Sequence, residues 1–103
     1  MRQNLAVTLA AAAILAASGT AGAADIVRGA DLYQRHCAGC HGASGTSTWP
    51  GTPNLARREG LLQPDTVLLQ VLRMGRGTKP GFRGLLTDAE ILDVIAYSRT
   101  LAR

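Results

Sequence analysis

The chain has 103 residues and a formal net charge of +4, and 47% of its residues are hydrophobic. This length is enough for one small domain. The basic residues are scattered, with Arg57-Arg58 as the only adjacent pair, so the sequence shows no nucleic-acid-binding footprint. The only two cysteines, Cys37 and Cys40, are so close that a disulfide between them would hardly constrain the unfolded chain. Because domains this small usually need a disulfide, a metal or another stabilising group, we expect a bound group of a different kind.

The first 23 residues have the features of a cleaved secretory signal peptide. Arg2 provides a positive charge, an apolar run extends from Leu5 to Ala17, and Ala21-Gly22-Ala23 fits the small-x-small pattern that precedes a cleavage site. The run is shorter than the ~18–20 residues that a helix needs to cross a bilayer. We therefore predict cleavage after Ala23, a mature domain of residues 24–103, and export to the periplasm without stable membrane insertion.

The mature domain is predicted to be all-α, because the alternation typical of strands is absent and three segments have helical spacing. The first helix runs from Ile26 to Arg35. Gly42 to Gln63, rich in Gly, Ser, Thr and Pro, is predicted to be a loop. Such a long loop is uncommon in a small domain, so we expect it to wrap the bound group. The first helix has apolar positions that can share one face: Ile26, Val27, Ala30 and either Leu32 or Tyr33.

The other two helices have recognisable ends. The second runs from Asp65 to Met74 and stops before Gly75, where a left-handed residue is favoured. The third begins at the capping box formed by Thr87 and Glu90 and continues to the C-terminus. The apolar residues of these two helices are Val67, Leu68, Val71 and Leu72 in the second, and Ile91, Leu92, Val94, Ile95 and Leu101 in the third.

Residues 37–41 form the pattern Cys-x-x-Cys-His. Two thiols at this spacing, at the end of a helix, can reach the two vinyl groups on one edge of a haem, and the next residue then brings an imidazole beneath the iron. We therefore predict that Cys37 and Cys40 hold one haem c covalently and that His41 is an axial iron ligand. His36 would then point elsewhere, and we expect it to face the solvent.

Other uses of this motif fit the chain less well. A thioredoxin-like redox pair needs a preceding strand in a βαβ unit, and no strand is predicted. A zinc site needs four ligands, whereas every cysteine and histidine of the chain lies within residues 36–41. Six consecutive residues cannot easily arrange four side chains as a tetrahedron, so haem attachment is the preferred interpretation.

The mature chain resembles class I cytochrome c over essentially its whole length. This resemblance implies a class I cytochrome c fold, with three main helices around one covalent haem and the first and last helices crossing near Gly29, Tyr33 and Tyr97. It also implies that the backbone carbonyl of Pro53 accepts the N–H of His41, which would fix the tautomer of that imidazole. Trp49 is expected either to pack against the haem edge or to be buried within its loop. The matching segments are Gly29 and Tyr33, the Cys37–His41 motif, Pro53-Asn54-Leu55, residues 75–82, residues 86–91 and Ala96-Tyr97.

The chain departs from this class at the sixth iron ligand. Most members have Met-Pro there, within Gly-x-Gly-x-Met-Pro-x-Phe, whereas this chain has Lys79-Pro80. Lys79 can bind iron as a neutral amine if its pocket is desolvated. Met74, the only methionine of the mature domain, can bind if the end of the second helix unwinds. Otherwise the iron is five-coordinate or carries water, and Lys79 faces the solvent.

These features predict an electron-transfer protein and not an enzyme, since no distal histidine or carboxylate is placed for peroxide chemistry. It would carry one haem c between larger periplasmic or membrane-bound redox enzymes. The alternative is a haem protein that binds small ligands, or that assists the maturation of a partner, through an open or labile distal site.

Overall fold

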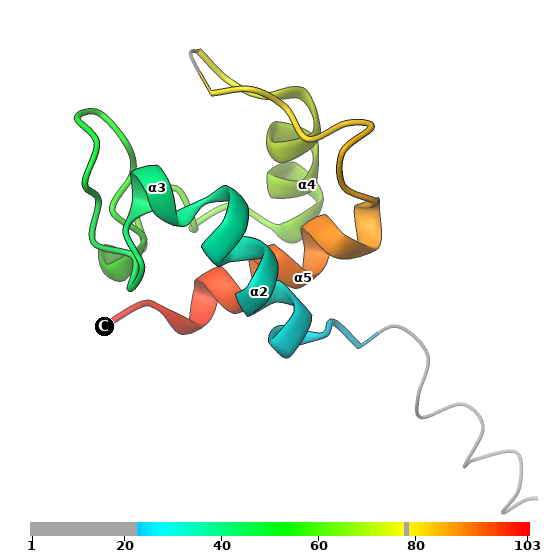
Figure 1. The fold of residues 1–103 in the computed structure, drawn as a ribbon, viewed down its shortest axis with the longest axis horizontal. Coiled ribbons are helices and arrows are strands. Elements are labelled where there is room, and N and C mark those ends of the chain that lie inside the picture. Colours follow the sequence, from blue (N-terminus) through cyan, green and yellow to red (C-terminus); the bar gives the residue numbers. More distant parts are fainter. Residues whose placement is uncertain (1–22, 78) are drawn as a thin grey trace, which may run out of the picture.

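The computed structural model describes residues 23–77 and 79–103, and the regular structure in this part of the chain is helical (Figure 1). The exception is an isolated bridge between Arg76 and Lys79. The all-α prediction is therefore confirmed, whereas the predicted signal peptide, apart from its last residue, lies outside the described residues. In the described ranges no helix is both long and apolar enough to cross a membrane. The elements are α2 (Ile26–His36), α3 (Ala38–His41), the 3-10 helix η1 (Leu55–Arg57), α4 (Asp65–Met74) and α5 (Asp88–Thr100).

Helices α2 and α5 cross in close contact, as the resemblance implied. Gly29 is buried at the crossing, and a Cβ added there would overlap the backbone carbonyl of Asp93. Next to this point the rings of Tyr33 and Tyr97 lie 5.3 Å apart at 57°. Glycine is therefore required at position 29 because the two helix backbones meet there.

The predicted apolar face of α2 is only partly correct. Ile26 and Val27 are 49% and 82% exposed, whereas Gly29, Leu32 and Tyr33 are buried. The buried face is set by the position of α5 over Gly29, which rotates the first-turn apolar residues towards the solvent. Hydrophobicity alone could not reveal this, because glycine contributes no apolar side chain to the pattern.

The start of α2 is attached to α5 through a buried carboxylate that the sequence did not single out. Asp93 is only 3% exposed. Its carboxylate accepts the backbone N–H of Asp25 at 2.7 Å and the Nε–H of Arg28 at 2.6 Å. The side chain of Asp25 in turn caps α2 by accepting the N–H of Arg28 at 2.9 Å. A buried charge is tolerated only when such partners satisfy it.

The predicted ends of the other helices are confirmed. At the start of α5, Glu90 accepts the N–H of Thr87 and donates its own N–H to the Thr87 hydroxyl, at 2.9 and 3.2 Å. Helix α4 ends at Gly75, whose φ of 81° favours glycine, although its ψ of 169° lies outside the left-handed helical region. The guanidinium of Arg99 in α5 holds the start of α4 by donating to Asp65 at 2.7 Å.

Replacement of Gly29 tests the helix crossing. Gly29→Ala places a methyl group against the α5 backbone and should destabilise the holoprotein by roughly 1–3 kcal/mol, measured by denaturant unfolding followed by circular dichroism. Gly39→Ala is the matched control, because a Cβ on that helical glycine meets nothing within 4 Å. Equal stabilities of the two variants would contradict the close crossing.

Candidate functional site

A cavity of about 1070 Å³ lies among the three main helices, the long loop that follows α3 and the segment that contains Arg76, Lys79 and Phe82. It is at the upper end of the ~300–1,000 Å³ that is usual for cofactor sites. All four apolar residues predicted for the second helix line it, and one of them, Val67, is still 41% exposed. The apolar face of α4 therefore borders open space as well as protein. Aliphatic residues on this side of the cavity include Leu55, Leu61, Val67, Leu68, Val71 and Leu72.

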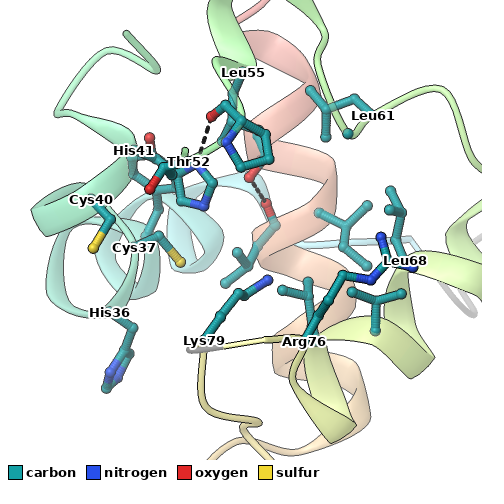
Figure 2. A pocket seen from close by; sticks show the side chains of 18 of the residues that line it. His36, Cys37, Cys40, His41, Thr52, Leu55, Leu61, Leu68, Arg76 and Lys79 are labelled. Carbon is teal, nitrogen blue, oxygen red and sulfur yellow. Dashed lines mark hydrogen bonds between the residues drawn. The ribbon is translucent and has the colours of Figure 1, made fainter. Parts of the chain in front are cut away.

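The Cys-x-x-Cys-His motif forms one side of this cavity. Cys37 ends α2 by donating its N–H to the carbonyl of Tyr33 at 2.8 Å, and α3 then turns through Cys40 and His41. Both thiols are free, and Figure 2 shows their sulfurs on the same side of the cavity as His41. In the polypeptide before any group is attached, burial raises the pKa of the half-buried Cys37 thiol to about 11.

The His41 ring is oriented by the backbone of Pro53. Its Nδ1 lies 3.0 Å from the Pro53 carbonyl oxygen. A carbonyl can only accept a hydrogen bond, so Nδ1 carries the proton and Nε2 keeps its lone pair. Burial lowers the pKa of His41, although the contact with Pro53 opposes that effect. The imidazole is therefore held in the neutral form that a metal ligand requires.

Hydrogen bonds that the sequence did not reveal attach the long loop to the motif. Thr48 donates its N–H to the carbonyl of Cys40 at 3.0 Å and its hydroxyl to that of Gly39 at 3.1 Å. The buried Tyr33 donates its hydroxyl to the carbonyl of Gly42 at 2.7 Å. These contacts join residues that are 8–9 positions apart, and no periodic sequence signal marks them.

Two aromatic side chains lie at the edges of the cavity. His36 is exposed, as expected, and meets the ring of Phe82 edge-on with centroids 5.9 Å apart. Figure 2 shows it pointing away from His41. Trp49 lines the cavity but is 63% exposed, so the expectation that it is buried within its loop is wrong. The turns around Trp49 place it at the surface of the loop rather than under it.

Lys79 approaches the cavity from the side opposite His41 (Figure 2). It belongs to a tight turn in which Arg76 and Lys79 exchange backbone hydrogen bonds of 3.1 and 3.0 Å. Phe82 joins this segment to α4 by donating its N–H to the carbonyl of Leu72 at 2.9 Å. Lys79 is half-buried, and burial lowers the pKa of its amine. The side chain therefore points inward, and not to solvent.

Met74, the other candidate ligand, is placed differently. Its side chain is 64% exposed at the end of α4 and is not among the residues that line the cavity. The structure therefore brings together Cys37, Cys40, His41, Pro53 and Lys79, and leaves Met74 outside.

The arrangement fits a large apolar group that brings its own metal. Within residues 23–77 and 79–103 no three His, Cys, Asp or Glu side chains form a cluster that could hold a metal ion alone. The cavity instead combines aliphatic side chains, two thiols at one side and nitrogen donors at two opposite sides. These groups fit a covalently attached haem.

Comparisons with known proteins agree with this chemistry. A sequence model of the family described as cytochrome c oxidase, cbb3-type, subunit III matches residues 24–97. Cytochrome c6 of Thermosynechococcus vestitus is 32% identical over 92 residues, which cover 86% of this chain and 81% of that protein. Cytochrome c6 of a Picosynechococcus species is 31% identical over an alignment of 107 positions that covers 94% of this chain and 92% of the relative.

Solved structures lead to the same family. Cytochrome c6 from the diatom Phaeodactylum tricornutum superposes with a TM-score of 0.62 at 27% identity, over 74% of this chain and 92% of that one. The c-type cytochrome KustC0563 superposes with a TM-score of 0.65 at 24% identity, over 73% of this chain and 98% of the KustC0563 chain. This similarity supports the fold. The chain belongs to the class I mono-haem cytochromes c and is an electron carrier with one covalently bound haem c.

Proposed function

We propose that this electron carrier is exported to the periplasm, is cleaved after Ala23, and passes electrons between larger periplasmic or membrane-bound redox enzymes. Its relatives are carriers and not enzymes. The observation that carries the proposal is one cavity with Cys37, Cys40 and His41 on one side and Lys79 on the other. The N-terminal segment supports export, because its charge and apolar length are those of a signal peptide.

Cys37 and Cys40 would hold the haem through thioether bonds, and His41 would bind its iron. When bound, the haem supplies the one-electron ferric–ferrous couple. The protein would orient the group by fixing Cys37, at the junction of α2 and α3, together with Cys40 and His41 in α3. The Pro53 carbonyl holds His41 with Nε2 available. The aliphatic residues of α4 would contact the apolar surface of the bound haem.

Lys79 would hold the iron on the side opposite His41. Its turn is fixed by backbone hydrogen bonds at both ends, and its amine lies inside the cavity with a lowered pKa caused by burial. Less free energy is then needed to remove the proton that must leave before the lone pair can bind iron. Met74 would have to enter from an exposed position and disrupt the end of α4. Two nitrogen ligands lower the reduction potential relative to a thioether.

The alternative, a protein that binds small ligands at an open distal site, is less well supported. It requires the side opposite His41 to be free, whereas Lys79 extends into the cavity there. A carrier also needs similar geometry in both oxidation states, and the short hydrogen-bonded segments that hold His41 and Lys79 provide it.

The attachment residues can be tested on the exported protein. We expect a mass equal to residues 24–103 plus one haem, a pyridine haemochrome typical of thioether-linked haem, and reversible one-electron reduction. Cys37→Ala and Cys40→Ala should each leave a single thioether and shift the haemochrome band, because one vinyl group then stays intact. Ser44→Ala, an exposed position in the neighbouring loop, is the control. A wild-type mass equal to the bare polypeptide would refute the proposal.

The sixth ligand can be identified by paired substitutions. Lys79→Ala should convert the ferric protein from a low-spin to a high-spin or water-bound spectrum and should permit rapid binding of CO to the ferrous form. Met74→Ala should leave both properties unchanged, because the Met74 side chain lies outside the cavity. If the near-infrared charge-transfer band changed only in Met74→Ala, the sixth ligand would be the thioether of Met74 and not the amine of Lys79.

Acid titration gives an independent check of Lys79. Only the neutral amine can bind iron, so protons compete with the metal as the pH falls. The wild-type ferric spectrum should therefore lose its low-spin bands on acidification, at a pH well below the ordinary lysine pKa of ~10.4, since both burial and iron favour the neutral form. The spectrum of Lys79→Ala should lack this transition, and its presence in that variant would exclude lysine as the titrating ligand.

A further inference from the structure

We propose that Ser47 is a positioning residue for His41, which it controls through the backbone carbonyl of Pro53. This inference rests on the proposed role of His41 as an iron ligand. It adds a residue that lies in the loop, outside the haem-binding motif and the segments that resemble class I cytochrome c.

The hydroxyl of Ser47 bonds to two consecutive carbonyls. Its Oγ lies 2.8 Å from the carbonyl oxygen of Thr52 and 2.9 Å from that of Pro53. A serine hydroxyl has one proton, so the two acceptors share it. The Pro53 oxygen also lies 3.0 Å from His41 Nδ1. It therefore accepts from two donors, one of them the imidazole, and a carbonyl with two lone pairs can do so.

Few other interactions of residues 52–54 fix the orientation of the Pro53 carbonyl. Pro53 has no N–H to donate, and its side chain is exposed. On one side Thr52 donates its N–H to the carbonyl of Trp49 at 3.2 Å, and on the other Asn54 donates its N–H to the carboxylate of Glu59 at 2.9 Å. Apart from the imidazole of His41, Ser47 thus provides the side-chain hydrogen bond to the Pro53 carbonyl and ties it back to the beginning of the loop.

The consequence for His41 follows from the partner of its Nδ1–H. A well-aligned carbonyl acceptor raises the basicity of the imidazole and fixes the orientation of its ring. Without the Ser47 hydroxyl the exposed carbonyl can rotate towards water, which lengthens its hydrogen bond to His41. The imidazole then donates less electron density, the ferric state is stabilised less, and the reduction potential rises.

The experiment compares Ser47→Ala, Ser47→Thr and Ser47→Val in the haem-loaded protein. Thr and Val have nearly the same shape and differ by the hydroxyl, so this pair separates the hydrogen bond from packing even if the alanine variant loads haem poorly. The readouts are the reduction potential and the solvent exchange of the His41 Nδ1–H, followed by NMR. Ser44→Ala, in the same loop, is the control.

We expect a higher potential and about tenfold faster Nδ1–H exchange in Ser47→Ala and Ser47→Val, with near wild-type values in Ser47→Thr and Ser44→Ala. Unchanged exchange and potential in the valine variant, or a lower potential, would overturn the inference. Absence of iron-shifted His41 resonances in the wild-type protein would instead refute the proposed axial ligand, so the two failures are distinguishable.

Discussion

The apolar face of α4 borders a cavity instead of packing fully against another helix, and the rest of the structure depends on how that cavity is filled. Side chains that a larger protein would bury against each other here surround a space of about 1070 Å³. In a chain this short the buried core is small, and the exposed fraction of Val67 shows that the protein alone does not cover this face. A haem held by Cys37 and Cys40 would fill the space and join the α2–α3 junction to the side formed by α4. The cofactor would thus be part of the core as well as the redox group.

The two proposed iron ligands are held in similar ways, although they come from distant parts of the chain. His41 lies in the short helix α3 and is oriented by the Pro53 carbonyl. Lys79 lies in a tight turn closed by the hydrogen bonds between Arg76 and Lys79. In both cases a hydrogen-bonded stretch of backbone lies next to the residue that provides the nitrogen. Such local rigidity keeps the ligands in place when the charge on the iron changes.

The crossing of α2 and α5 is the packed part of the fold to which the segments with His41 and Lys79 are connected. It combines the backbone contact at Gly29, the paired tyrosine rings and the buried Asp93, which accepts hydrogen bonds from the start of α2. Burial raises the pKa of Tyr33 to about 12, so its hydroxyl remains protonated and donates to Gly42 just after the motif. The same crossing therefore positions both the helices and the first residue of the long loop.

The sequence by itself determined the helices, the Cys-x-x-Cys-His pattern and the family, because helix periodicity, the capping box of Thr87 and Glu90, and this pattern are local features that short segments encode. Val67, Leu68, Val71 and Leu72 could thus be assigned to one face without a structure. Only the tertiary structure decided which surface of α2 is buried, that Lys79 points inward while Met74 does not, and that Ser47 bonds to the carbonyl that orients His41. Those properties depend on contacts between segments that are distant in the chain or that follow irregular turns, and such contacts leave no periodic trace in the amino-acid sequence.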